Sequence, residues 1–342
     1  MIDLDVPQPY LIFLGDVTVG TVAKTAFGLR DWAPERCVGE YTLAGATVST
    51  GLPHLSPAEA RLKGARSMVI GAAPIGGAIT PSWIPALQEA LKAGLDLVSG
   101  MHTRLESVPQ LAETATRLGR RLINVREPPQ GLPTGSGRKR TGRRLLTVGT
   151  DCALGKKYTA LTLTREFKKR GVDADFRATG QTGVLIAGRG IAVDAVVADF
   201  IAGAAEVLSP DAAADHWDVV EGQGSLFHPA YAGVSLGLLH GSQPDVIVMC
   251  HEVGRDRVFG APDYATPSIR EAIEVNLTHA RRTNPAARCA GVSLNTSKLN
   301  EVQARATLEE HSRALNLPVA DPLRPGPELD RLVDACLERV RP

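Results

Sequence analysis

The stretch LLTVGTDCALGKKYT, residues 145–159, decides the fold of the second half of the chain. Its first residues are apolar and predict a short buried strand, and a helical pattern follows the loop. That loop contains Gly149 and Gly155 and ends at Lys156. Strand, glycine loop, lysine and helix are the context of a phosphate-binding loop, because backbone N–H groups, the helix N-terminus and the lysine charge all face the anion. The alternative is a glycine turn with solvated lysines.

Two positions depart from the usual phosphate loop. Thr150 takes the place of the first glycine, and Lys157 stands where Ser or Thr normally binds Mg²⁺. A cation at this place repels Mg²⁺ and attracts another phosphate oxygen. We therefore expect a phosphorylated ligand and no metal ion, rather than Mg-ATP hydrolysis.

The composition limits the class of protein. The chain has 342 residues, 44% hydrophobic residues, 4% aromatic residues and a net charge of +1. No apolar run reaches the roughly 20 residues of a membrane span, and neither charge nor aromatics favour nucleic acid. The N-terminus has acidic residues and no apolar signal segment. The five cysteines are scattered without a CxxC pair, so we expect a reducing, cytoplasmic setting without disulfides or zinc.

The segment GLPTGSGRKRTGRR, residues 131–144, is the best domain boundary, since it combines Gly, Pro and a basic run without apolar periodicity. We predict a Rossmann-like domain over residues 1–134, a basic linker over 135–144 and a P-loop domain over 145–342. A solvated linker is favoured over a nucleic-acid patch. Both domains are expected to be α/β with mainly parallel sheets, because short apolar runs alternate with helical patterns.

The same patterns place the individual elements. Strands are predicted over residues 11–14, 68–70, 95–98, 122–125, 145–148, 173–177, 219–221, 246–250 and 291–294. Helices are predicted over 18–29, 83–93, 105–118, 193–207, 268–280 and 301–315, and directly after the phosphate loop.

A second signal is DVVEGQGSL, residues 218–226, in which a strand delivers Glu221 to its carboxyl end and a glycine loop follows. Ligands of open α/β sheets bind at that edge. Glu221 is a candidate to hold a metal or a substrate ammonium, or to act as a base. The structural alternative is a salt bridge that closes the loop.

Two histidines accompany this edge. His228 lies in the loop that follows Glu221, and a histidine there is a candidate general base because its pKa lies near working pH. His251 and Glu252 end the predicted strand VIVMCHE and share the same edge. A hydrogen-bonded structural histidine is the alternative for His228.

Three polar positions are less specific. Gln181 and Thr182 lie in a glycine-bracketed loop that suits a small polar substrate, and a simple turn explains the pattern nearly as well. Cys152 lies inside the phosphate loop, where positive potential lowers a thiol pKa. It is a candidate to attack a thioester, and a small packed loop residue is the favoured alternative.

GTDCALGKK together with VEGQGS resembles the dethiobiotin-synthetase-like branch of the P-loop fold, in which Asn295 fits the purine-reading position. The chain is further similar, over nearly its whole length, to the DgcN family. The segments that carry this resemblance are YLIFLGD, ERCVGEY, SWIPALQEALKAGLDLVSGMH, GTDCALGKK, ATGQTGVLIAG, VDAVVADFIAGAAE, VVEGQGSLFHPAYAGVSLGLLHGSQPD, CHEVGR and GVSLNTSKL.

The resemblance implies N-acetylation of a D-amino acid, D-glutamate in the characterised case, with acetyl-CoA as co-substrate. Coenzyme A is a phosphorylated purine nucleotide that needs no Mg²⁺, which agrees with Lys157. The expected catalytic residues are Glu221, His228 and His251. The expected cofactor-binding residues are Gly149, Thr150, Asp151, Cys152, Ala153, Gly155, Lys156, Lys157, Tyr158 and Asn295. The expected substrate-binding residues are Gln181, Thr182, Gln223, Ser225 and Glu252.

Substrate carboxylates need cations, and Arg177, Arg255 and Arg257 are candidates. We expect a small-molecule substrate, no nucleic acid or membrane partner, and a homo-oligomer. Two other functions stay open. An ATP- and Mg-dependent ligase or kinase acting on a small carboxylate would match the dethiobiotin-like branch, and a non-catalytic nucleotide-binding regulator would need no base.

Overall fold

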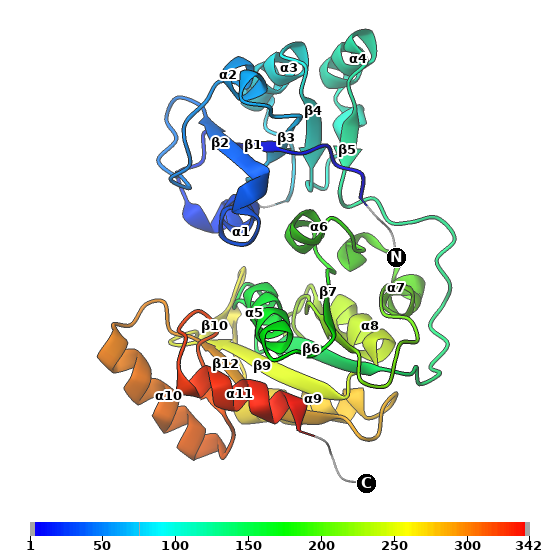
Figure 1. Ribbon diagram of the computed structural model, residues 1–342, viewed down its shortest axis with the longest axis vertical. Coiled ribbons are helices and arrows are strands. Elements are labelled where there is room, and N and C mark those ends of the chain that lie inside the picture. Colours follow the sequence, from blue (N-terminus) through cyan, green and yellow to red (C-terminus); the bar gives the residue numbers. More distant parts are fainter. Residues whose placement is uncertain (1–3, 75, 339–342) are drawn as a thin grey trace. The chain divides into compact units, whose positions relative to one another are not determined.

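The computed structural model describes residues 4–74 and 76–338, which form two compact units. The first unit contains Met1–Pro128 and Gly180–Ala195, and the second contains Pro129–Thr179 and Val196–Pro342. The chain thus leaves the second unit after Thr179 and returns at Val196. A continuous second domain was the expectation from sequence. Figure 1 shows the helices and strands of both units.

The first unit is built on a parallel sheet of order β2-β1-β3-β4-β5. Its strands are β1 (Tyr10–Gly15), β2 (Cys37–Thr42), β3 (Ser67–Ile70), β4 (Asp96–Ser99) and β5 (Leu122–Asn124). Helices α2 (Pro57–Leu62), α3 (Ile84–Lys92) and α4 (Pro109–Leu118) pack together on one face. Helices α1 (Lys24–Trp32) and α6 (Gln181–Ala187) contact each other. This order is that of a doubly wound α/β fold.

The second unit has a parallel sheet of order β13-β12-β9-β6-β8-β7. Its strands are β6 (Arg143–Gly149), β7 (Ala174–Arg177), β8 (Trp217–Val220), β9 (Val246–Glu252), β12 (Arg288–Asn295) and β13 (Val319–Ala320). A separate antiparallel hairpin consists of β10 (Arg257–Val258) and β11 (Ala261–Ala265). The prediction of two α/β domains with mainly parallel sheets is confirmed.

Helices cover the second sheet on both faces (Figure 1). α5 (Lys156–Lys169) and α11 (Pro327–Leu337) contact one another, and α7 (Ile201–Leu208), α8 (Ala232–Ser242) and α9 (Ile269–Ala280) form a contiguous group; α10 (Glu301–Leu315) packs at β13. The buried core includes Leu145, Leu163, Phe167, Val219 and Val248. Short 3-10 helices are Gly20–Val22, Pro34–Arg36, Pro81–Trp83, Leu105–Ser107, Val193–Ala195 and Ala198–Phe200.

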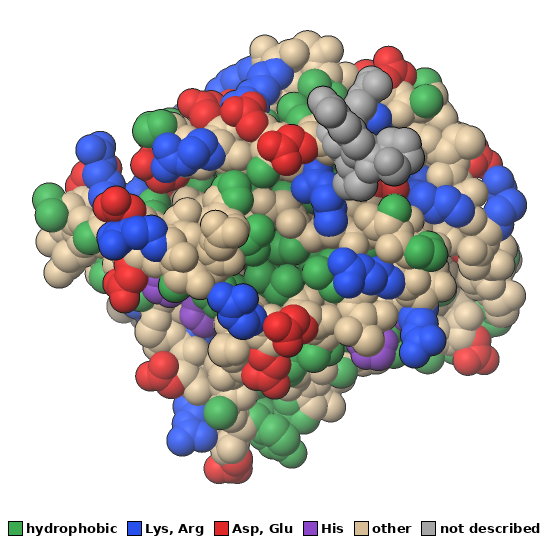
Figure 2. All heavy atoms as spheres, turned by 90° about the horizontal axis from the view of Figure 1, so that it is seen from below, with side chains coloured by type: hydrophobic (Ala, Val, Ile, Leu, Met, Phe, Trp, Pro, Cys, Tyr) green, Lys and Arg blue, Asp and Glu red, His purple; other side chains and the backbone are tan. Residues whose placement is uncertain are grey.

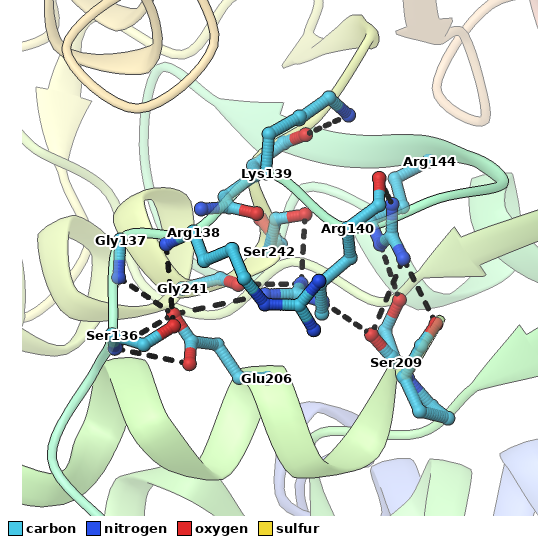
Figure 3. Close-up of polar contacts among 12 residues, drawn as sticks. Ser136, Gly137, Arg138, Lys139, Arg140, Arg144, Glu206, Ser209, Gly241 and Ser242 are labelled. Carbon is cyan, nitrogen blue, oxygen red and sulfur yellow. Dashed lines mark hydrogen bonds and ion pairs between the residues drawn. The ribbon is translucent and has the colours of Figure 1, made fainter. Parts of the chain in front are cut away.

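The basic linker is anchored, and the expectation that it is solvated was wrong for Arg140 and Arg144 (Figure 3). Arg140 is 5% exposed, and its guanidinium donates to the carbonyl oxygens of Ser209 (2.7 Å) and Gly241 (2.8 Å), at the ends of α7 and α8. Arg144 is fully buried in β6 and donates to the Ser209 hydroxyl at 2.8 Å. Helix ends leave carbonyl oxygens without partners, and these arginines satisfy them.

Several elements were not predicted. β2, β13, the hairpin and helices α2, α6, α8 and α11 are absent from the predicted set, whereas α10 begins and ends as predicted. α8 reads AGVSLGLLHGS, in which apolar residues and glycines lie on all sides and give no clear stripe. α6 was interpreted as a polar loop because glycines bracket it.

The surface is mixed in charge. Figure 2 shows lysines and arginines interspersed with acidic residues over the face that it presents. This pattern agrees with the net charge of +1. Among the residues that the structure describes, no helix is both long and apolar enough to cross a bilayer.

Candidate active site

Three neighbouring strands bring the candidate residues to one edge of the second sheet. β6 lies between β8 and β9, and its last residue, Gly149, pairs with Cys250 of β9. Val220, the last residue of β8, also pairs with β6. Because the carboxyl ends of parallel strands meet at one edge, the phosphate loop, Glu221 and His251 emerge at the same edge.

The phosphate loop holds its lysine inside. Lys156 is the first residue of α5 and only 6% exposed, and its Nζ donates to the carbonyl oxygen of Asp151 at 2.7 Å. Burial lowers the pKa of Lys156 and outweighs Cys152 and the other acidic groups nearby, which raise it. The ammonium therefore lies at the N-terminus of α5, where an incoming phosphate would find both the charge and the helix dipole.

Close packing around this lysine requires glycine at position 222 and favours it at position 149. A Cβ at Gly222 would lie 1.7 Å from the carbonyl oxygen of Thr147 and 3.0 Å from Cδ of Lys156. A Cβ at Gly149 would lie 3.1 Å from Nζ of Lys156 and from the carbonyl oxygen of Asp151. The glycine loop after β8 thus rests directly on β6, and the Gly222 N–H donates to the Thr147 hydroxyl at 2.9 Å.

The loop also contains left-handed backbone. Gly155, the N-cap of α5, has φ of 110°, and Ala153 has φ of 58°. Glycine adopts this region freely, whereas a residue with a Cβ pays about 1–2 kcal/mol. Local strain of this kind is typical of ligand-binding loops. Lys157 and Tyr158 follow in the first turn of α5, with the Lys157 ammonium 5.3 Å from the Tyr158 ring centre.

Asp151 is a fully buried carboxylate inside this anion-binding loop. Its Oδ1 accepts the N–H of Cys152 at 2.6 Å. Its Oδ2 accepts the N–H of Phe259 at 2.7 Å and an N–H of Arg255 at 3.2 Å. The side chain therefore points at Arg255 and the β10–β11 hairpin, which neutralise and anchor it.

Glu221 is 4% exposed, and it is hydrogen-bonded to Thr179, which follows the neighbouring strand β7. Its carboxylate accepts the N–H of Thr179 at 3.0 Å, and its carbonyl oxygen accepts the Thr179 hydroxyl at 2.6 Å. The Gln223 side chain donates to the same hydroxyl at 3.1 Å. Glu221 also raises the pKa of Lys156, after the larger effects of burial and of the thiols. The Glu221 carboxylate is thus close enough to Lys156 to favour its charged form.

Both ring nitrogens of His228 are engaged. Nδ1 accepts the N–H of Ala230 at 3.1 Å, and Nε2 is 2.9 Å from the carbonyl oxygen of Phe259. The ring is 4% exposed and stacks on Tyr231 with centroids 4.4 Å apart. This arrangement corresponds to the structural alternative considered for this residue.

His251 is the residue before the last in β9, and one of its ring nitrogens is bonded to the phosphate loop. Its Nδ1 lies 2.8 Å from the hydroxyl of Thr150, and the Thr150 N–H donates to the Cys250 carbonyl oxygen at 3.1 Å. Burial and the neighbouring His311 lower the pKa of His251 to about 4. The imidazole is therefore neutral at physiological pH and able to accept a proton.

Glu252 is held by cations. Lys298 lies 2.7 Å from its Oε1, and Arg255 binds its Oε2. Burial raises the pKa of Glu252, but the hydrogen bonds from Lys298 and Arg255 outweigh burial and lower it. The carboxylate thus stays charged and forms, with Arg255 and Asp151, a continuous row of paired charges at the sheet edge.

Asn295 and Ser225 both shape loops at this edge. The Asn295 Oδ1 accepts the N–H of Ser297 at 3.0 Å. The Ser225 hydroxyl donates to the Gly149 carbonyl oxygen at 3.0 Å and accepts the N–H of Phe227 at 3.2 Å. A loop-forming Asn was the alternative to a purine-reading one.

Comparison with known proteins agrees with this two-part architecture. Residues 35–128 match a Rossmann-like domain of unknown function, the N-terminal domain of DUF1611, and residues 132–333 match its P-loop domain, which is also of unknown function. The chain belongs to the DUF1611 family. A crystal structure of a DUF1611 family protein from Anabaena variabilis is similar, with a TM-score of 0.88, 34% identity and coverage of 97% of this chain and 99% of that chain.

Two curated relatives of this DUF1611 protein are each named D-glutamate N-acetyltransferase. The protein from Pseudoalteromonas is 48% identical over 94% of this chain and 97% of its own length. The protein from Tritonibacter scottomollicae is 47% identical over 96% of this chain and 98% of its own length.

Within the DUF1611 chain, two of the expected substrate residues belong to the first unit. Gln181 and Thr182 begin α6. The Thr182 hydroxyl bonds that of Thr25 on α1 at 2.9 Å, and Gln181 lies against Gly100, where a Cβ would meet its side chain. The other expected site residues all belong to the second unit.

Three side chains with the right chemistry for a metal lie close together in the DUF1611 site. Ligand atoms of Asp151, Cys152 and His228 are within 4.8 Å of one another. Asp151 is already neutralised by Arg255, and both nitrogens of His228 have partners. Lys156 adds a further cation close to Cys152. These surroundings do not suit a divalent cation, which would compete with two cations and several hydrogen bonds.

Two residues of this site, Phe259 and Thr179, carry no signal in the sequence that singles them out. Phe259 contributes only its backbone to the contacts with Asp151 and His228, so no side-chain pattern could signal it. Thr179 was part of the glycine-bracketed segment ATGQTG but was not separated from its neighbours. Its contact with Glu221 depends on the pairing of β7 with β8, which sequence alone does not give.

Proposed function

We propose that this protein transfers the acetyl group of acetyl-CoA to the amino group of D-glutamate. The observation that carries the proposal is the similarity to two proteins named D-glutamate N-acetyltransferase, at 48% and 47% identity over nearly the full length of both partners. The geometry of the second unit supports it in three ways.

The phosphate loop suits the nucleotide part of coenzyme A. Lys156 supplies a charge at the N-terminus of α5, where phosphate oxygens bind well. Lys157 occupies the position of the usual Mg²⁺-binding hydroxyl. Acyl transfer from a thioester does not require a metal ion to activate a phosphate. A second lysine at this position can therefore strengthen the binding of the coenzyme A phosphates.

His251 is the best-placed base. Its pKa of about 4 keeps the ring neutral, and Thr150 orients it through Nδ1. A weak base suffices here, because the amine proton becomes acidic once the nitrogen has attacked the thioester carbonyl. We assign Nε2 of His251 to accept that proton, with Glu221 as the second candidate.

Recognition of the glutamate carboxylates requires a cation that is not already paired. Arg177 lies 2.5 Å from Asp218, and Arg255 is paired with Asp151 and Glu252. Arg257, on β10, is exposed. We therefore favour Arg257 among the three arginines as the carboxylate ligand.

The test is a direct assay with purified protein. Acetyl-CoA is mixed separately with D-glutamate, L-glutamate and D-aspartate, and products are identified by mass spectrometry with and without EDTA. We expect N-acetyl-D-glutamate and free coenzyme A in both conditions. A product that needs ATP and Mg²⁺ and disappears in EDTA would overturn the proposal in favour of a ligase or kinase. Tight nucleotide binding without turnover of any amine would favour a regulator.

A further inference from the structure

Phe259 lies in the turn of the β10–β11 hairpin, and its peptide groups are held from two sides. Its N–H donates to Oδ2 of Asp151 at 2.7 Å. Its carbonyl oxygen accepts from Nε2 of His228 at 2.9 Å. One residue of the hairpin turn is therefore hydrogen-bonded to two loops, the phosphate loop and the loop after Glu221. These two loops lie far apart in the sequence.

The hydrogen-bond partners fix the proton of His228. A carbonyl oxygen only accepts, so Nε2 must carry the proton that it shares with Phe259. Nδ1 accepts the N–H of Ala230 at 3.1 Å and is therefore unprotonated. His228 is thus a neutral imidazole whose lone pair is directed at a backbone amide. A general base needs that lone pair to face the proton it removes.

Asp151 is committed in the same way. It is fully buried, and its carboxylate accepts the N–H groups of Cys152, Phe259 and Arg255. Arg255 continues to Glu252 and lies over the Phe259 ring, with Cζ 5.9 Å from the ring centre. Because these three donors hold the carboxylate in place and a phosphate would repel it, the side chain stays directed away from a bound phosphate.

The ring of Phe259 is the outward part of this assembly. The residue as a whole is 40% exposed, although its backbone is tied to two buried side chains. Tyr231, which stacks on His228, is 50% exposed. Aromatic rings fixed at the rim of a phosphate loop offer an apolar surface to the part of a nucleotide ligand beyond its phosphates.

We propose that His228 and Asp151 are positioning residues, which together clamp Phe259 and the β10–β11 hairpin onto the phosphate loop so that the acyl donor meets a preformed surface. Neither residue transfers a proton. The inference rests on the proposed function only in the choice of acyl donor, since the clamp itself is a property of the second unit.

The first experiment measures the clamp without any reaction. Hydrogen exchange of the amides in residues 257–265 is compared in the wild type, His228→Ala, His228→Gln and Asp151→Asn. Gln places an amide N–H near the position of Nε2 and should keep the bond to Phe259. We expect exchange at Phe259 to be about tenfold faster in His228→Ala and Asp151→Asn, the factor of one lost hydrogen bond, and near wild type in His228→Gln. Equal exchange in all variants would overturn the clamp.

The second experiment separates positioning from proton transfer. For a positioning role, His228→Gln keeps most of kcat/KM, and His228→Ala lowers it about tenfold with the same pH profile. A base would make both variants equally inactive and remove a limb of the pH profile. His279→Gln, on α9, is the matched control.

A third measurement keeps the two hypotheses distinguishable. Calorimetric titration with coenzyme A needs no D-glutamate and should rank the variants as the exchange data do. If D-glutamate is not acetylated but this ranking holds, the proposed function fails and the clamp stands. If acetylation is seen and His228→Gln is as inactive as His228→Ala, the clamp fails and the function stands. Thermal unfolding of each variant identifies any that has not folded.

Discussion

The hydroxyl of Thr150 and Nδ1 of His251 lie 2.8 Å apart, which joins the phosphate loop to the end of β9. Thr150 stands where most phosphate loops have their first glycine. The departure from the glycine pattern thus has a definite consequence, because glycine has no hydroxyl to orient the imidazole. Nε2 of His251 is left as the nitrogen that can take part in proton transfer.

The first prediction concerns His251 and pH. His251→Gln should lower kcat by about 10²–10⁴-fold, the usual cost of losing a general base. Because the pKa of His251 is lowered to about 4, the wild-type ring is neutral at pH 7 and is protonated only as pH falls through 4. The wild-type rate should therefore show an acid limb near pH 4, and the variant should lack it.

Two variants of Thr150 serve as controls for this prediction. Thr150→Ser keeps the hydroxyl and should keep the rate, whereas Thr150→Val should reduce kcat without moving the acid limb. An NMR titration of the His251 ring checks the pKa directly. An unaltered rate and pH profile in His251→Gln would exclude it as the base.

The second prediction concerns Glu221, the competing base. Its carboxylate accepts the N–H of Thr179 and raises the pKa of Lys156. Glu221→Gln preserves an oxygen for Thr179 but removes the negative charge. If His251 is the base, Glu221→Gln should lower kcat about tenfold, which corresponds to the loss of one charge-assisted contact. The acid limb of the pH profile should stay as in the wild type. Loss of that limb in steady-state kinetics would transfer the role of base to Glu221.

The third prediction concerns stability. Arg140 is buried and donates to carbonyl oxygens at the ends of α7 and α8 (Figure 3). Arg140→Ala should lower the free energy of unfolding by about 1–3 kcal/mol, because buried carbonyl oxygens lose their donors. Lysine lacks the planar fork and should restore little of it.

Chemical denaturation measures this effect, and Arg138→Ala is the matched control. The Arg138 side chain is 65% exposed and pairs with Asp211 at the surface, so its loss should leave the midpoint nearly unchanged. Equal denaturation midpoints for the wild type and Arg140→Ala would contradict this prediction, because they would show that water can bond these carbonyl oxygens without lowering the free energy of unfolding.

The main features of the candidate site could be predicted from the sequence. Local patterns of apolar residues, glycines and polar strand ends predict the phosphate loop, the position of Glu221 directly after β8 and the position of His251 near the end of β9. Their meeting at one edge follows from parallel topology. These are properties of short segments and of a common fold.

The state of His228 was not readable. Its proton position depends on the Ala230 amide and the Phe259 carbonyl oxygen, and backbone groups leave no trace in residue identities. The burial of Arg140 was hidden for a similar reason, since the basic run around it resembles a solvated linker until the ends of α7 and α8 are placed. Sequence patterns identify side chains that carry chemistry, but they do not show which backbone groups form hydrogen bonds with those side chains.

The last prediction tests the phosphate loop itself. Lys156→Ala should weaken coenzyme A binding by about 10- to 100-fold, because a charge-assisted hydrogen bond is worth roughly 1.5–3 kcal/mol. The matched control is Lys168→Ala, since Lys168 lies on the same helix with its side chain 58% exposed. Calorimetric titration should show weaker binding for the first variant only. Equal affinity of both variants would mean that coenzyme A binds elsewhere, and the glycine turn would then be a structural feature, since its lysine already bonds the Asp151 carbonyl oxygen.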